Sequence, residues 1–172
     1  STASSITLPS LTVTGNVQLD SGITTTGAQI YNNNVVVKAG TRASAAVISA
    51  ANSDISFKGT LKGEGNAKAR SLTINAGTGN ILFGDRVGYA FNGQTVNINN
   101  TADSFYKMTV TGNEITVKGD VMTYEEKTYN GNVLVGSTAS NGTTRTFITM
   151  NSKVIFNGLA NDTIKGKHTL IA

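Results

Sequence analysis

Residues able to do nucleophilic or metal chemistry are few in this chain and lie far apart. Among 172 residues there is one histidine and no cysteine, so a nucleophilic triad would depend on His168, which has no acidic residue close to it in the sequence. The absence of cysteine excludes a disulfide, a thiolate nucleophile and a thiolate metal site. We therefore expect no nucleophilic active site, no metal site and no cofactor.

The ten carboxylates are also dispersed. The six aspartates occur singly, without the dense oxygen-ligand spacing of a calcium loop, at Asp20, Asp54, Asp85, Asp103, Asp120 and Asp162. Glu125 and Glu126 are adjacent, and neighbours on a strand point to opposite faces, so we interpret them as a solvated turn and not as an acid/base couple. We predict that the protein is not an enzyme. A glycan-processing β-helix enzyme stays open as the alternative, with Asp85 beside Arg86 as the place to look for it.

Basic residues cluster at one place. Fourteen lysines and arginines against ten acids give a net charge of +4, and the clustered ones are Lys58, Lys62, Lys68 and Arg70. A nucleic-acid site combines such a patch with stacking aromatic side chains, and this glycine-rich segment has none. We expect solvated turn charges and no nucleic-acid partner, with attraction to an anionic surface or a glycan as the alternative.

Small uncharged residues take the place of charge. The chain has 25 threonines, 19 asparagines and 19 glycines, and only 14% of its residues are charged, against roughly 25% in a typical soluble domain. All three residue types disfavour helix. No stretch approaches the roughly 18 apolar residues that a transmembrane helix needs. We predict an all-β chain with no significant helix and no transmembrane segment.

Short pairs of apolar residues alternate with polar ones, which is the period of strands with one buried face. The pairs are Leu11 and Val13, Val17 and Leu19, Val35 and Val37, Ile55 and Phe57, Leu72 and Ile74, Ile81 and Phe83, and Val96 and Ile98. Asparagine- and glycine-rich turns separate them. We expect the phenylalanines to fill the core and the tyrosines to seal its corners with their hydroxyls in water. A sugar-stacking strip is the alternative for the set Tyr31, Tyr89, Phe91, Phe105, Tyr106, Tyr124 and Tyr129.

The sequence also repeats itself. Residues 11–16 (LTVTGN) recur 97 residues later as 108–113 (MTVTGN), and Tyr31-Asn32 recurs 98 residues later as Tyr129-Asn130. We divide the single segment 1–172 into a repeat unit at 11–107 and a truncated second unit at 108–172. A sandwich has no reason to repeat over this length, whereas a parallel β-solenoid needs only about 20 residues per coil. This predicts eight or nine coils and a rod of about 40 Å.

Stacked coils give the composition a structural role. Asparagine and threonine at equivalent turn positions can hydrogen-bond from coil to coil as ladders. An uncapped solenoid also exposes unpaired strand edges, so we predict end-to-end association. The Thr-x-Thr pairs at 12–14 and 109–111 are too widely separated to predict the regular array of an ice-binding solenoid.

Several runs resemble the repeats of filamentous-haemagglutinin-like exoproteins, which are large bacterial adhesins exported by two-partner secretion. The runs are 24–37, 54–61 and 71–83, followed in the second copy by 127–136, 141–146 and 154–158. The resemblance extends over roughly residues 23–170. It implies a right-handed parallel β-helix in the shaft of a secreted or surface-anchored adhesin.

The same resemblance implies a function. It predicts that the segment mediates cell or surface attachment as part of a virulence factor, with a host-cell or glycan receptor as its partner and a location outside the bacterial cell. No catalytic residues are carried over. The Asn-Pro motifs of the family's secretion domain are missing, since the one proline, Pro9, follows Leu8. A sandwich-type carbohydrate-binding module is the further alternative.

Overall fold

The structure is built from parallel β-strands. The computed structural model describes residues 7–65, 70–88, 103–136, 145–149, 152–162 and 170–171, and none of these is helical. Every paired strand runs parallel to its partner. The predicted all-β class is confirmed, and the parallel pairing is that of a β-solenoid rather than of a hairpin sandwich.

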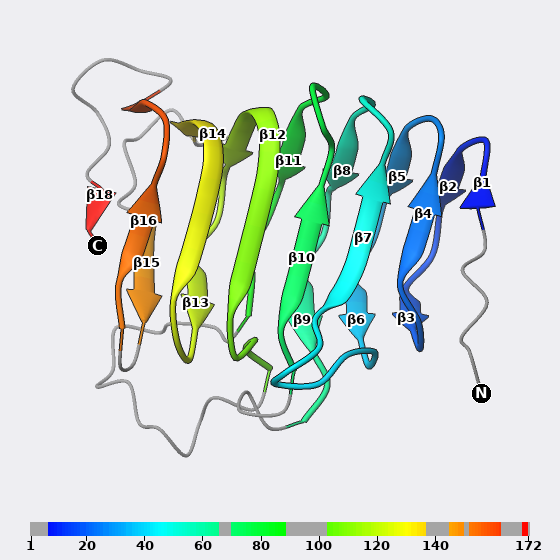
Figure 1. The fold of residues 1–172 in the computed structure, drawn as a ribbon, viewed down its shortest axis with the longest axis horizontal. Coiled ribbons are helices and arrows are strands. Elements are labelled where there is room, and N and C mark those ends of the chain that lie inside the picture. The colour runs from blue at the N-terminus through cyan, green and yellow to red at the C-terminus, as the bar shows by residue number, and fades with distance from the viewer. Residues whose placement is uncertain are drawn as a thin grey trace.

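Strands stack from coil to coil on three faces, which we call faces 1, 2 and 3 (Figure 1). Faces 1 and 2 join into one 12-stranded sheet, and face 3 consists of two three-stranded sheets linked by isolated bridges at Val87. Face 1 consists of β1 (Thr7–Leu8), β4 (Ile23–Thr25), β7 (Ala46–Ala50), β10 (Leu72–Asn75), the first parts of β12 (Met108–Val117) and β14 (Lys127–Val135), and β16 (Val154–Phe156). Face 2 consists of β2 (Leu11–Val13), β5 (Gln29–Tyr31), β8 (Ile55–Phe57), β11 (Ile81–Phe83), the second parts of β12 and β14, and β17 (Ala160–Asp162). Face 3 consists of β3 (Val17–Leu19), β6 (Val35–Val37), β9 (Leu61–Gly63), a bridge at Val87, β13 (Val121–Thr123), β15 (Arg145–Thr149) and β18 (Leu170–Ile171).

The described strands form seven coils, fewer than the eight or nine predicted. Stacked partners reveal why. Thr7 pairs with Thr24, 17 residues later, Ile55 pairs with Ile81, 26 later, and Leu72 pairs with Met108, 36 later. The turns therefore take up more residues than a constant 20 per coil allows.

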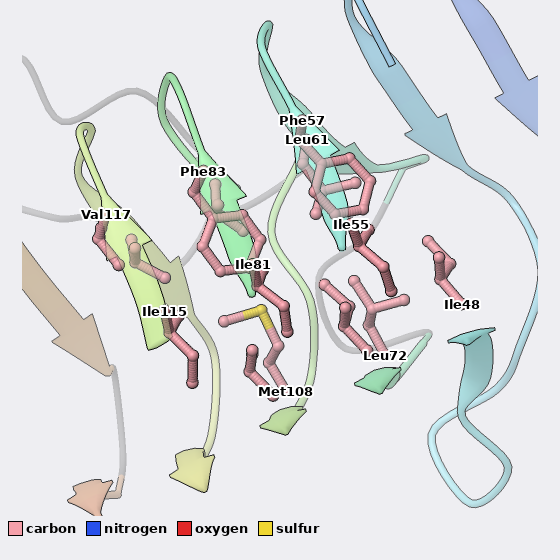
Figure 2. Close-up of a cluster of buried hydrophobic side chains, with 14 of the residues drawn as sticks. Ile48, Ile55, Phe57, Leu61, Leu72, Ile81, Phe83, Met108, Ile115 and Val117 are labelled. Atoms are coloured by element: carbon pink, nitrogen blue, oxygen red, sulfur yellow. The ribbon is translucent and has the colours of Figure 1, made fainter. Parts of the chain in front are cut away.

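Alternate residues of each strand point into one continuous core. Figure 2 shows Ile55 and Phe57, Ile81 and Phe83, and Ile115 and Val117 in this arrangement on successive coils. The rings of Tyr31, Phe57 and Phe83 stack in a column, with centroid separations of 5.0 and 5.8 Å. Each such pair contributes about 0.5–1.5 kcal/mol beyond the burial of its area. The column thus links coils 2, 3 and 4 through the interior.

The expectation that the tyrosines place their hydroxyls in water is wrong for two of them. Tyr31 and Tyr129 are both fully buried. Tyr129 stacks on Phe156 at 5.3 Å and meets Phe147 edge-on at 5.7 Å. Both tyrosines lie within strands, at inward-facing positions, and not at corners. The core therefore accommodates phenolic hydroxyls as well as rings.

The predicted side-chain ladders are present at the corners. Between faces 2 and 3, Asn16 Oδ1 accepts the Asn34 N–H at 3.2 Å, and Asn34 Oδ1 accepts both the N–H and the hydroxyl of Thr60, at 3.0 and 2.9 Å. Each asparagine thus satisfies backbone donors on the next coil, which strand pairing leaves free at a turn. This use at a corner explains part of the excess of asparagine and threonine.

Repeat partners lie on different faces. Leu11 is on face 2 but Met108 is on face 1, and Tyr31 is on face 2 but Tyr129 is on face 1. Val35 on face 3 corresponds to Val133 on face 2. The shift is one face in every case. The 97- or 98-residue spacing therefore preserves the order of strand and turn but not the position around the coil.

Candidate functional site

The basic residues picked out from the sequence do not form one free patch. Lys62 Nζ lies 3.2 Å from Asp103 Oδ1, and the Arg70 guanidinium donates to the backbone carbonyl of Glu64. Lys68 lies outside the described residues. Lys58 is exposed and directly follows β8, at the start of the turn that leads to β9. The ammonium group of Lys58 has no hydrogen-bond or ion-pair partner among the described residues.

The carboxylates considered in the sequence, Asp85 as the place to look for an enzyme and Glu126 as part of a solvated turn, have structural contacts. Asp85 Oδ1 accepts the backbone N–H of Arg86 at 2.7 Å, so this carboxylate bonds to the turn in which it lies. Glu126 is half-buried and lies 3.9 Å from Lys153 Nζ. His168 lies outside the described residues. Within the described part of the chain, no group of three or more His, Asp or Glu side chains is placed to hold a metal ion.

A shallow groove of about 300 Å³ crosses face 2 at coils 3, 4 and 5. It is lined by Asp54, Ile55, Ser56, Asn80, Ile81, Leu82, Thr116 and Lys118. These residues come from β8, β11 and the second part of β12, which are neighbours in the sheet. We call this feature the face 2 groove.

The parallel register arranges the groove in three rows. The floor is Ser56, Leu82 and Thr116, which are register partners on the outer side of the sheet. Asp54, Asn80 and Glu114 each come directly before an inward-facing isoleucine of their strand. They follow one another from coil to coil along one rim of the groove. Beyond the inward-facing Phe57, Phe83 and Val117, the opposite rim has Lys58, Gly84 and Lys118. The solenoid thus converts three sequence-distant pentapeptides into one surface with an acidic rim, a mixed floor and a basic rim.

Hydrogen bonds fix the acidic rim. Asp54 Oδ1 accepts the Asn80 N–H at 2.7 Å, and Asn80 Oδ1 accepts the Glu114 N–H at 3.3 Å. Glu114 Oε1 in turn accepts the Thr116 hydroxyl at 3.4 Å, which ties the rim to the floor. Rigid polar groups of this kind lose little conformational entropy when they bind a ligand.

The basic rim has free charges and a close approach between coils. Neither Lys58 nor Lys118 makes an ion pair with a described residue. Between them, a Cβ on Gly84 would lie 2.9 Å from the Lys58 carbonyl oxygen and 3.0 Å from its Cα. Glycine therefore allows the coils to approach here. Sequence reasoning assigned Lys58 to a basic cluster with Lys62, but their register places them on different faces.

A lysine side chain lies in the core. Lys127 is fully buried, and its Nζ donates to the carbonyl oxygens of Val121 at 2.8 Å and Ile148 at 2.5 Å. Burial lowers the pKa of Lys127 well below its usual value, because desolvation disfavours the charged form. Nothing in the sequence alone marks Lys127 as buried, although the repeat aligns it with Gln29, two positions before a tyrosine in both copies.

The aromatic residues proposed as a sugar-stacking strip are divided between core and surface. Tyr31, Tyr129 and Phe105 are buried, and Tyr89 and Phe91 lie outside the described residues. Tyr106 and Tyr124 are half-buried and stack on each other at 5.9 Å. The guanidinium carbon of Arg42 lies 4.6 Å from the Tyr106 ring centroid. The Tyr106 ring is therefore already in contact with a tyrosine ring and a guanidinium group of the protein itself.

Comparisons with known proteins give no match. No protein-family model, curated protein or solved structure is similar to this chain at a significant level. The described residues also include no helix with the length and apolar character to cross a membrane. The geometry of the solenoid is therefore the basis for any functional proposal.

Proposed function

We propose that this chain is a structural and adhesive segment of a secreted or surface-exposed bacterial adhesin. In this proposal it is a right-handed parallel β-helix, resembling the shafts of filamentous-haemagglutinin-like exoproteins, and it presents binding surface without catalysing a reaction. The observation that carries the proposal is the parallel stacking of strands on three faces through the seven coils that the described residues form.

This architecture suits a shaft because each coil contacts only its neighbours, so length is added without changing the cross-section. The aromatic column from Tyr31 to Phe83 and the ladder from Asn16 to Thr60 both run along the axis. They connect successive coils in the interior and at a corner. The outward-facing side chains of the three faces are available to contact a partner.

The first coil supports the predicted end-to-end association. Leu11, Val13 and Val17 are only partly buried, whereas their stacked neighbours Tyr31 and Val35 are fully buried. A hollow of about 210 Å³ opens at this end, lined by Leu8, Leu11, Gln18, Leu19, Asp20, Ser21, Gly22 and Ile23. Among the described residues, each strand of this coil pairs on one side only. An apolar interior next to such an edge favours contact with a further coil, either of the same chain or of a second copy.

The proposal is tested by attachment. Beads coated with the 172-residue chain are expected to adhere to epithelial cells or to immobilised glycans more than beads coated with an unrelated solenoid do. Antibodies against the chain should label intact bacteria that produce it. Equal adhesion of both bead types, together with labelling only after the cells are permeabilised, would exclude the adhesive function.

Glycan hydrolysis is the second candidate, and one observation favours it. Asp54 and Glu114 occupy the same rim two strands apart, a separation of about 9.6 Å at the usual strand spacing, close to the upper limit for the carboxyl pair of an inverting glycosidase. Among the described residues, however, Asp54 is the one carboxylate that lines the groove. Release of reducing ends from a polysaccharide, abolished in Asp54→Asn, would replace the non-enzymatic proposal.

A further inference from the structure

We propose that the face 2 groove binds an uncharged hexopyranose chain. This inference rests on the proposed adhesive function, because it names the class of ligand for one surface that the shaft presents. It is drawn from the three rows of side chains across β8, β11 and β12 and from the charges at their ends.

The floor fits the ring of a sugar. Leu82 is half-buried at its centre, with Ser56 and Thr116 on the adjacent strands as register partners. At the usual strand spacing the backbones of Ser56 and Thr116 each lie about 4.8 Å from the backbone of Leu82. A pyranose has an apolar C–H face and hydroxyls around its edge, so it can place the first on Leu82 and the second on Ser56 and Thr116.

The rims supply complementary hydrogen-bonding groups. A sugar hydroxyl both donates and accepts, and it is best satisfied by an acceptor on one side and a donor on the other. The carboxylate of Asp54 and the rim residue Asn80 lie on one side of Leu82, and the Lys118 ammonium, which is only a donor, lies on the other. Binding sites for polar ligands commonly combine an apolar surface with a few such oriented groups.

Charge favours an uncharged chain. The acidic rim carries Asp54 and Glu114 and the basic rim carries Lys58 and Lys118, so the two rims cancel (−2 and +2). Asp85, beside Gly84 at the basic rim, adds one further exposed carboxylate, so the surroundings of the groove carry −3 against +2 and are close to neutral. A polyanion meets a row of carboxylates and a polycation meets a row of ammonium groups, and each is repelled by the row of its own sign.

Backbone pairing disfavours a peptide ligand. An extended peptide usually binds a sheet by adding a strand to an open edge, which provides main-chain hydrogen bonds. Strand β8 pairs with β5 and β11, and β11 pairs with β8 and β12, so neither has an open edge. A ligand on this face can contact side chains only. This requirement suits a glycan, whose hydroxyls bond readily to side chains.

The test is a binding titration with the 172-residue chain, followed by NMR. The neutral probes are cellohexaose, laminarihexaose and maltohexaose, and the charged probes are a hyaluronan hexasaccharide and a chitosan hexamer. We expect at least one neutral hexaose to bind with a dissociation constant on the order of 1 mM or tighter. It should bind more tightly than either charged probe, and resonances of Ser56, Leu82 and Thr116 should shift on its addition.

Two matched variants locate the site. Leu82 and Leu134 both point outward on face 2 and both are half-buried, but only Leu82 lines the groove. Leu82→Lys should weaken binding of the neutral hexaose by more than about tenfold, a cost of about 1.4 kcal/mol, and Leu134→Lys should leave it unchanged. Retained amide spectra show that both variants fold.

Failure of this inference can be told apart from failure of the adhesive function. If no neutral hexaose binds, if hyaluronan or chitosan binds more tightly, or if both lysine variants weaken binding equally, the groove is not the proposed site. Coated beads that still attach to cells after Leu82→Lys would leave the adhesive function intact in that case. Reducing ends released from a bound hexaose and lost in Leu82→Lys would support the groove but overturn the non-enzymatic function.

Discussion

The hydroxyl of Tyr31 donates a 2.8 Å hydrogen bond to Oε1 of Gln29, two residues earlier on β5. The Gln29 amide donates to Thr25 Oγ1 at 3.1 Å and to the Ser49 carbonyl at 2.7 Å, so every member of this buried group has a partner. In the second repeat copy the corresponding hydroxyl, that of Tyr129, is buried and has no hydrogen-bond partner among the described residues. The corresponding tyrosine hydroxyls of the two repeat copies therefore differ in their hydrogen bonding.

Removing the two hydroxyls should have different effects on the free energy of unfolding. Tyr31→Phe leaves Gln29 Oε1 buried without a donor, so we expect the free energy of unfolding to fall by about 1–3 kcal/mol. Tyr129→Phe removes an orphaned polar atom and should leave that free energy unchanged or raise it. Urea unfolding of both variants measures the difference. Equal losses would show that Tyr129 has a hydrogen-bond partner in solution.

Replacing Lys127 should change how stability depends on pH. The pKa of Lys127 is lowered on folding, so between its folded pKa and the usual 10.5 the unfolded chain binds more protons and stability rises with pH, by up to about 1.4 kcal/mol per unit. Lys127→Gln, which introduces the residue found at the equivalent position 29, removes this dependence. The unfolding free energies of the two proteins should therefore differ most at low pH, with the variant more stable there.

Gln29→Lys is the matched control for that experiment, because it places a lysine among groups already satisfied by glutamine. It should lower stability, and more so at low pH. Above about pH 10 the pH dependence of the unfolding free energy changes sign for wild type and for Gln29→Lys. The pKa values of Tyr31 and Tyr129 are raised by burial, so the unfolded chain ionises first and stability falls as pH rises further. A flat profile for wild type below pH 9 would contradict the role assigned to Lys127.

The aromatic column should be the most sensitive part of the core. Phe57 is fully buried between Tyr31 and Phe83. Phe57→Ala removes both ring contacts and leaves a cavity, and we expect a loss of about 3–5 kcal/mol in the free energy of unfolding. Ser56→Ala, one residue earlier but facing outward, should change it by less than about 0.5 kcal/mol. Similar losses in the two variants would argue against an inward-facing column.

The corner ladder should depend on single asparagines. Asn34→Ala removes the acceptor for the N–H and hydroxyl of Thr60, at an expected cost of about 1–3 kcal/mol. Its neighbour Asn33 is exposed like Asn34 but makes no side-chain hydrogen bond with a described residue, so Asn33→Ala serves as the control and should be near neutral. Hydrogen exchange of the Thr60 amide provides a local measurement, with faster exchange expected in Asn34→Ala alone.

End-to-end association should depend on the first coil. Leu11→Lys places a charge in the open apolar end beside Leu8 and Ile23. Sedimentation velocity over a range of concentrations should show association of the wild-type chain and a reduced association constant for the variant. Leu134→Lys adds the same charge on the side of the rod and should associate as wild type does. A monomeric wild-type chain at high concentration would refute the association.

Local features of the fold were predictable from the sequence because they depend on neighbouring residues. The alternation at Ile55 and Phe57 predicted a strand with an inward-facing side, and that strand is β8. Asparagine at corners predicted ladders, and Asn16 and Asn34 form one. Lys127 was missed because a lysine at an inward-facing position looks like a surface residue until its two carbonyl partners, Val121 and Ile148, are known.

The face 2 groove could not be predicted in the same way. Ser56, Leu82 and Thr116 are 26 and 34 residues apart, and neither spacing is the 97- or 98-residue repeat of the sequence. Their alignment depends on the turns between coils, whose lengths vary from one coil to the next. The same variation moves Tyr129 to face 1 while Tyr31 lies on face 2.

By itself the sequence determined the strands, the turn residues and the polar ladders, since φ/ψ preferences and alternation act over a few residues. Only the tertiary structure decided which strands are neighbours, how many coils the chain makes and where Asp54, Leu82 and Lys118 meet. The physical reason is that a parallel strand finds its partner one full coil away, between 17 and 36 residues along the chain. That distance is set by how the turns pack and not by any local pattern.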